Sequence, residues 1–371
     1  ISRLYSEDYT LLVAPTGAGK TVICLTAIKE LIDEGVLKRV IVAAPAKVVE
    51  NDVWGKEVQK WDHLKGLTGM VLTGSPADRK ELLQKVTADV IVVSLNNLDW
   101  LLDVDHGADG IIIDELSKAA GKQTAGMRSK KKAGCFVWKC GMTATPVSQN
   151  FEKLYSMARI LDPQYLGTNK QKYLDQYFYS DYQGYNWTLR DGADELIAAK
   201  IAPLVHLVED TKANDLPPCR EHVITFDMPD DTRVVYNDMK KHMIAGDVEA
   251  ANEAVKSGKL RQIASGFMYE DDDKVVYLDR SRVDAMRSWA DALDGNTGII
   301  FYEFVEQGKQ LVLTTPDNVR CVQIQSMSHG VDGLQHEYAD LLFLQPPWSR
   351  DNKEQAIGRV WRTGQTEEVN V

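Results

Sequence analysis

The sequence predicts an α/β fold with two halves, each built on a parallel sheet flanked by helices. Short apolar runs rich in β-branched residues recur in the first third of the chain and again near its end. Helix-length segments separate these runs, and continuous apolar runs are typical of strands buried on both faces of a parallel sheet. A length of 371 residues is sufficient for two domains.

In the first half, we expect four strands with a helix between the first two. The strands correspond to "TLLVAP", "VIVAAP", "VIVVSL" and "GIIIDE", at 10–15, 40–45, 90–95 and 110–115. Residues 21–34 carry apolar side chains at helical spacing, and Gly35 follows as a residue that ends helices. "CFVWKC" at 135–140 is a further strand candidate.

The second half begins after a helical stretch and a proline-rich linker. Periodicity is helical over 151–208, and "LPP" at 216–218 predicts a linker because tandem prolines stop helices and stiffen connections. A mostly helical stretch follows, and strand-like runs return at 298–304, 319–325 and 339–345. We therefore expect an N-terminal domain over 1–215 with a helical insertion at about 151–210, and a C-terminal domain over 216–371 with a helical segment at about 230–293.

Composition limits the classes of protein. The net charge of -11 argues against a protein that coats nucleic acid by bulk charge, although a local basic track is compatible with it. The densest basic run is "RSKKK" at 128–132, and such runs are more often solvated loops than binding sites. Five cysteines at spacings that fit no zinc pattern indicate reduced thiols. No apolar run approaches the length of a membrane span.

"APTGAGKT", which begins at Ala14, has the pattern of a phosphate-binding loop. It follows a predicted strand and opens a predicted helix, which is the context that such a loop requires. Its glycines allow the backbone N–H groups to point inward, and the helix N-terminus adds positive potential. We expect Lys20 to reach the β- and γ-phosphates and Thr21 to ligate Mg²⁺. The predicted nucleotide-binding residues of this loop are Thr16, Gly17, Ala18, Gly19, Lys20 and Thr21.

"IIIDEL" places two acids, Asp114 and Glu115, at the end of a predicted strand. Adjacent side chains at a strand end diverge, so the two can have different roles. We expect Asp114 to bind Mg²⁺, and Glu115 to orient and deprotonate the attacking water. The simpler alternative is a pair of helix-capping acids, but the phosphate-binding loop upstream favours catalysis.

Two turn-like motifs are weaker on their own. "GMTATP" puts the hydroxyls of Thr143 and Thr145 in a turn after a strand candidate, and "SHGVDGLQ" is a glycine-broken turn that contains Asp332. Ordinary β-turns explain either motif when it is taken alone.

"QAIGRVWRTGQ" contains Arg359 and Arg362, three residues apart. On a helix this spacing places both guanidinium groups on one face, where they repel each other unless an anion lies opposite. If the second half faces the first, both can point at the γ-phosphate and stabilise charge that develops during hydrolysis, as arginine fingers.

These motifs, in this order, resemble the superfamily 2 helicases and translocases, which have two RecA-like domains with ATP between them. Further details resemble the Swi/Snf-type DNA translocases, especially compact phage and bacterial relatives. The details are the pattern Pro45, Trp54, Glu57 and Trp61, the motifs "DELS" and "GMTATPVSQN", the segment "KLRQIASGFMY" and the closing "QPPWSRDNKEQAIGRVWRTGQTEEVNV". The resemblance covers nearly the whole chain.

The resemblance implies roles for further residues. Gln355 would join the ATPase site, Gly330 and Asp332 would lie between ATP and nucleic acid, and Thr143 and Thr145 would couple hydrolysis to domain movement. It implies that the helical insertions grip duplex DNA. The residues that it implies in nucleic-acid contact are Pro45, Lys47, Ser94, Asn96, Arg128, Ser326, Ser328 and His329.

We therefore expect an ATP- and Mg²⁺-dependent motor that moves along duplex DNA in the cytoplasm of a bacterial or phage-infected cell, with no membrane partner. A protein partner that supplies basic surface would reconcile DNA binding with the acidic composition. The alternatives are a helicase that separates strands of DNA or RNA, a DNA-binding module that uses nucleotide only as a switch, and an unrelated P-loop kinase or NTPase.

Overall fold

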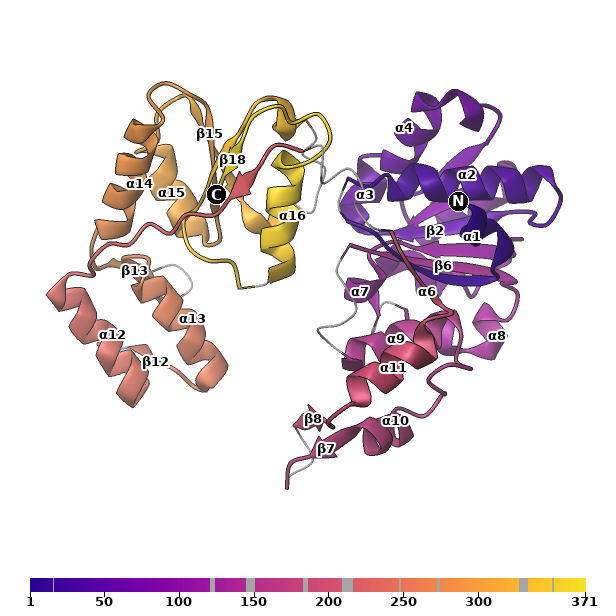
Figure 1. Cartoon of the computed structure of the whole chain (residues 1–371), viewed down its shortest axis with the longest axis horizontal. Helices are drawn as coiled ribbons and strands as arrows, with labels where there is room; N and C mark the ends of the chain where they lie inside the picture. The colour runs from indigo at the N-terminus through magenta and orange to yellow at the C-terminus, as the bar shows by residue number, and fades with distance from the viewer. Residues whose placement is uncertain are drawn as a thin grey trace. The chain divides into compact units, whose positions relative to one another are not determined.

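The computed structural model describes the chain except for residues 16, 121–123, 145–150, 183–185, 209–215, 247, 272–273, 327–332 and 349. The described chain forms two compact units, 1–213 and 214–371. The sequence predicts the boundary between 215 and 216, beside a stretch that lies outside the described residues. Figure 1 labels many of the elements of each unit. No helix in the described ranges is long and apolar enough to cross a membrane.

The first unit is built on a seven-stranded sheet in the order β3-β4-β2-β5-β6-β1-β9. Every neighbouring pair in it is parallel, as predicted. Its strands are β1 (Tyr9–Val13), β2 (Val40–Ala44), β3 (Gly69–Leu72), β4 (Val90–Ser94), β5 (Gly110–Ile113), β6 (Trp138–Thr143) and β9 (Val205–Leu207).

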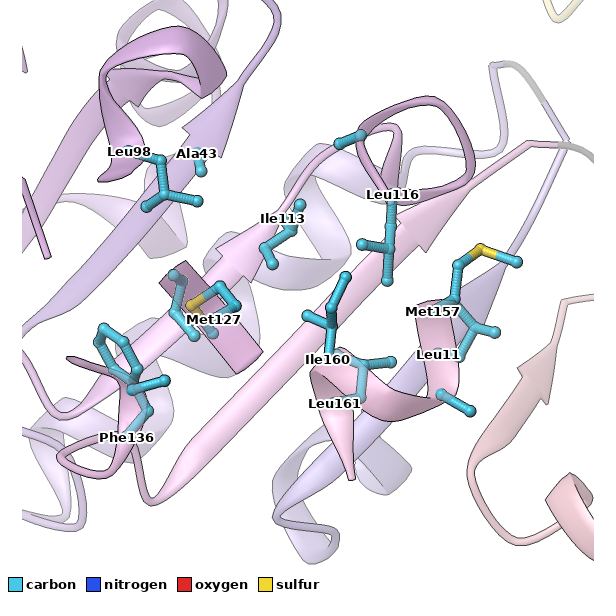
Figure 2. Packing of buried hydrophobic residues seen from close by; sticks show 14 of the residues in the cluster. Leu11, Ala43, Leu98, Ile113, Leu116, Met127, Phe136, Met157, Ile160 and Leu161 are labelled. Atoms are coloured by element: carbon cyan, nitrogen blue, oxygen red, sulfur yellow. The ribbon is translucent and has the colours of Figure 1, made fainter. Parts of the chain in front are cut away.

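Helices cover both faces of this sheet (Figure 1). Successive residues of a strand point to opposite faces, so Ile41 packs in one hydrophobic cluster and Val40 and Val42 in another. Figure 2 shows part of the first cluster, where Leu11 and Ile113 of the sheet lie beside Leu116 and Met157. The helices are α1 (Ser2–Ser6), α2 (Lys20–Asp33), α3 (Ala46–Glu50), α4 (Val53–Lys60), α5 (Pro76–Lys85), α6 (Leu95–Leu101), α7 (Leu116–Ala119), α8 (Lys130–Ala133), α9 (Phe151–Leu161), α10 (Lys170–Tyr177) and α11 (Ala193–Ile201).

Two expectations for this unit were wrong in part. The strand predicted at 135–140 lies further along, because the apolar run continues through Cys140 and Met142 and all of β6 beyond Lys139 is buried. The region 151–208 is not wholly helical: β7 (Phe178–Ser180) and β8 (Trp187–Leu189) form a hairpin, and β9 extends the sheet beside β1. Strands of three residues are too short to show a period in the sequence.

The second unit contains a five-stranded parallel sheet in the order β10-β18-β17-β15-β16. The predicted runs are confirmed as β15 (Gly298–Tyr302), β16 (Val319–Gln323) and β17 (Asp340–Phe343), while β10 (Cys219–Arg220) and β18 (Val369–Asn370) were not predicted. The helices α14 (Ser281–Ala292), α15 (Val305–Val312) and α16 (Arg350–Val360) belong with this sheet.

The predicted helical segment of the second unit contains α12 (Asp230–His242) and α13 (Glu253–Ile263) as well as α14. Two small antiparallel hairpins were not predicted there: β11 (Ile244–Ala245) with β12 (Val248–Glu249), and β13 (Phe267–Asp271) with β14 (Lys274–Tyr277). We call α12 to β14 the helical segment from here on.

Candidate nucleotide-binding site

Three of the predicted motifs meet at the carboxyl ends of three neighbouring strands. In the first sheet β6 lies between β5 and β1. Asp114 follows β5, Thr143 ends β6, and the phosphate-binding loop follows β1. In open parallel sheets, ligands bind outside the carboxyl ends of the strands. The topology therefore places the loop, the acids and Thr143 at one ligand-binding edge.

The phosphate-binding loop has the backbone that a phosphate cradle needs. Gly17 and Gly19 have φ of 87° and 74°, the left-handed region in which other residues are strained. Lys20 begins α2 and its Nζ donates to the carbonyl oxygens of Ala14, at 2.8 Å, and Pro15, at 2.9 Å. The ammonium thus lies against the loop. Ala18 lies in the loop and Thr21 in the first turn of α2, whereas Thr16 lies outside the described residues.

The two acids have different environments. One carboxylate oxygen of Asp114 accepts the backbone N–H of Glu115, at 2.9 Å. Desolvation and, to a smaller extent, the negative charge of Glu115 raise the pKa of Asp114 to about 7, against the opposing effect of Lys20. Glu115 has φ of 52°, which is unusual for a residue other than glycine. Strained backbone of this kind clusters at functional sites.

Thr143 contacts both neighbouring motifs. Its backbone carbonyl accepts the N–H of Ala14, at 3.0 Å, and its Oγ1 donates to Ser117 Oγ, at 2.9 Å. The expectation that Thr143 lies in a turn was wrong, because it is the buried last residue of β6. Its predicted partner in coupling, Thr145, lies outside the described residues. The role of Ser117 was missed, although it belongs to the motif "DELS" that the sequence singled out.

In the second unit, α16 carries Gln355 and Arg359, both half-buried. The expectation that both arginines share a helix was wrong: α16 ends at Val360, and Arg362 lies in the turn that follows, with its N–H donating to the carbonyl of Val360 at 3.2 Å. This end of the helix is anchored, because Trp361 Nε1 donates to the carbonyl of Pro217 at 2.7 Å. The roles of Gln355, Arg359 and Arg362 in hydrolysis remain predictions, and Gly330 and Asp332 lie outside the described residues.

Some of the residues predicted to contact nucleic acid lie at the same edge of the first sheet. Pro45 follows β2 and Ser94 ends β4, and these two strands are neighbours with Ala44 opposite Ser94. Lys47, on α3, forms an ion pair with Glu50 at 3.4 Å. Asn96 lies on α6. These residues therefore lie at the edge formed by the carboxyl ends of the strands, beside the nucleotide motifs, because β2 is the neighbour of β5.

The other predicted contacts are more scattered. Arg128 ends a short 3₁₀ helix, Ala125–Arg128, and Ser326 ends another, Ile324–Ser326, after β16. Ser328 and His329 lie outside the described residues. Within the basic run that contains Arg128, Lys132 pairs with Asp103 at 2.7 Å and with Asp99 at 3.4 Å. Two carboxylates therefore compensate the charge of Lys132, so this run offers less free positive charge for binding nucleic acid than its sequence suggests.

A cavity of about 370 Å³ lies in the second unit, and Pro346, Pro347 and Lys353 of the closing motif are part of its lining. Apolar side chains dominate its lining, together with Arg282, whose guanidinium donates to the carbonyls of Ala264 and Leu344. None of the predicted site residues lines it. The cavity therefore does not coincide with the predicted nucleotide site.

Comparison with known proteins agrees with the motifs. Residues 4–272 match the model of the SNF2-related domain. The chain is 26% identical to putative protein p41 of Acyrthosiphon pisum secondary endosymbiont phage 1, over 99% of this chain and 88% of that protein. It is 20% identical to the uncharacterized ATP-dependent helicase YqhH of Bacillus subtilis (strain 168), over 97% of this chain and 71% of that protein.

Among solved structures, the Pyrococcus furiosus Hef helicase domain matches with a TM-score of 0.56 at 13% identity, over 100% of this chain and 93% of that one. This match confirms the predicted fold class of two RecA-like domains. The family match confirms the predicted resemblance and an ATP-hydrolysing, helicase-like motor. With its phosphate-binding loop, acids and Thr143 at one sheet edge, the chain belongs to the SNF2-related domain family.

Proposed function

We propose that this chain hydrolyses Mg²⁺-ATP to move along double-stranded DNA. The observation that carries the proposal is that the nucleotide motifs and the predicted DNA contacts lie at the same edge of the first sheet, where its strands have their carboxyl ends. Nucleotide motifs follow β5, β6 and β1, and the predicted DNA contacts follow β4 and β2, in one continuous row of neighbouring strands. A structural change caused by nucleotide binding or hydrolysis would thus arise close to the residues predicted to contact DNA.

The residues at this edge fit Mg²⁺ and a triphosphate. Burial penalises ionised Asp114, and a divalent cation would offset that penalty. Among the described residues, no group of three or more His, Cys, Asp or Glu side chains could hold a metal. Mg²⁺ commonly takes one or two protein ligands together with phosphate and water. Asp114 and Thr21 would supply these ligands, and the ion would neutralise charge on the phosphates.

Protein groups supply the remaining chemistry. Lys20 exchanges its loop carbonyl acceptors for phosphate oxygens when nucleotide binds. Glu115 orients the attacking water and takes its proton. Arg359 and Arg362 act on the γ-phosphate and stabilise charge that develops in the transition state, and Gln355 assists them. Thr143 transmits the change through Ala14 and Ser117.

Contacts to the DNA backbone fit movement along any sequence, because phosphates carry no direct sequence information. We propose that Pro45, Lys47, Ser94 and Asn96 line this track, and that binding weakens with salt. With a net charge of -11, the track is narrow or is completed by a basic protein partner.

The test is the steady-state ATPase rate with duplex DNA, single-stranded DNA or RNA added at low salt. Strong stimulation by duplex DNA that Glu115→Gln abolishes is the expected result. Stimulation by single strands or RNA alone would favour a strand-separating helicase. Nucleotide binding without hydrolysis under any condition would favour a nucleotide-switched binding module.

A further inference from the structure

A buried polar network joins three segments of the second unit. Ser265 follows α13, Gln307 lies on α15 and Gln345 follows β17, and each side chain is at least 93% buried, with exposures of 3%, 1% and 7%. Ser265 Oγ donates to Gln345 Oε1 at 2.6 Å, and Gln307 Nε2 donates to Ser265 Oγ at 3.1 Å. Networks in which buried groups satisfy one another hold their segments in one arrangement.

Glu303 and Arg261 extend this network to the segment before α16. Gln345 Nε2 donates to Glu303 Oε2 at 2.9 Å, and the same carboxylate forms an ion pair with Arg261 of α13. Arg261 Nη2 also donates to the carbonyl of Pro346, at 2.8 Å, and the guanidinium lies 5.2 Å from the ring centre of Trp348. One side chain of the helical segment thus holds the connection between β17 and α16 at two points.

This connection leads directly into α16. Pro346 and Pro347 are tandem prolines with fixed φ, so the backbone between Arg261's two contacts is stiff. Arg350 begins α16 only four residues after Pro346, and Ala356 and Val360 of that helix are fully buried against the sheet. A shift at the start of α16 would therefore be passed along the helix toward Arg359 and the turn that bears Arg362.

We propose that Arg261 is a positioning residue for hydrolysis, which sets α16 and its arginines through Pro346, Trp348 and Glu303. The proposal rests on the proposed function, in which Arg359 acts on the transition state. The position of the helical segment would then be communicated to the nucleotide through this guanidinium group. No residue of the network needs to touch the nucleotide.

The test is the ATPase rate of Arg261→Met alone and in an Arg359→Ala background. We expect kcat to fall at least tenfold in Arg261→Met, with KM for ATP changed less than threefold. In the Arg359→Ala background, Arg261→Met should cost clearly less than it does in the wild-type background, because one of the two arginines that it positions is already absent. Arg261→Lys, which keeps the charge, should recover part of kcat. Arg287→Met, at an exposed position of α14, is the matched control and should leave kcat unchanged.

Several results would overturn the proposal. An unchanged kcat in Arg261→Met would do so, and so would an equal fold-loss in both backgrounds, which indicates general destabilisation. The melting temperature of each variant separates loss of folding from loss of positioning. If Arg359→Ala itself leaves kcat unchanged, the arginine role in the proposed function fails and the positioning proposal falls with it. If Arg359→Ala lowers kcat but Arg261→Met does not, the proposed function stands and this inference alone fails.

Discussion

Thr143 Oγ1 lies 2.9 Å from Ser117 Oγ, and this hydrogen bond ties the end of β6 to the short helix that follows the two acids. The carbonyl of the same threonine accepts the N–H of Ala14 at the start of the phosphate-binding loop. One residue therefore contacts the two segments that would sense ATP and its hydrolysis. A change in either segment would therefore reach the other through Thr143.

We expect Thr143→Val to reduce stimulation of the ATPase by DNA by about threefold to tenfold, in line with one lost hydrogen bond of about 1 kcal/mol. The basal rate should change less, because the catalytic acids stay in place. The measurement is the ATPase rate with and without duplex DNA. Thr10→Val is a matched control, since Thr10 is buried on β1 and its hydroxyl has no hydrogen-bond partner within the described structure. Equal stimulation in wild type and Thr143→Val would contradict a coupling role.

Lys20→Met should lower ATP affinity or hydrolysis at least about 100-fold, because a charge-assisted contact to phosphate is lost. It also leaves the carbonyls of Ala14 and Pro15 without this donor, so the loop itself should loosen. ATP binding by fluorescence titration and the ATPase rate check this expectation. Lys29→Met, at the far end of α2, removes only an ion pair with Asp33. Near-normal ATP binding by Lys20→Met would show that this loop is not the phosphate cradle.

The raised pKa of Asp114 predicts a pH dependence of stability. In the folded, metal-free protein its pKa is about 7, against 3.8 for an unperturbed aspartate. Between these values the folded state binds more protons than the unfolded state, so stability from this group falls as pH rises from about 4 to about 7. Asp114→Asn cannot ionise and should be more stable than wild type at pH 8, with the difference shrinking as pH falls below 7.

Thermal unfolding of both proteins without Mg²⁺ at pH 5 and pH 8 checks this expectation. The same substitution should abolish hydrolysis, since the proposed Mg²⁺ ligand is lost. A difference in melting temperature that does not depend on pH would show that Asp114 is not a desolvated carboxylate. Addition of Mg²⁺ at pH 8 should stabilise wild type more than Asp114→Asn.

The sequence predicted this sheet edge well because its motifs are local. A strand, a glycine-rich turn and a helix follow each other within 9–33, and each leaves its own pattern of apolar and small residues. The acids after β5 are local in the same way. Parallel strands with continuous apolar runs then place their carboxyl ends at one edge.

Contacts between distant segments could not be predicted in this way. Ser117 is ordinary in sequence, and its pairing with Thr143 depends on the neighbouring positions of β5 and β6 in the sheet. Arg261 and Glu303 are 42 residues apart, and no periodicity connects them. Strands of only two residues, such as the paired β10 and β18, are fixed by tertiary packing rather than by their own sequence.

The end of α16 leads to the last prediction. Arg359 lies within the helix and Arg362 in the turn beyond it, so the two guanidinium groups do not depend on a common helical face to reach one phosphate. We expect Arg359→Ala and Arg362→Ala each to lower kcat about 1,000-fold, as loss of an arginine finger does, with ATP affinity changed only a few-fold. Arg350→Ala, at the exposed start of the same helix where Arg350 pairs with Glu354, should retain the wild-type kcat. A large loss of kcat in one variant with none in the other would assign transition-state stabilisation to a single arginine. Loss of ATP affinity without loss of kcat would show that both arginines act in ground-state binding instead.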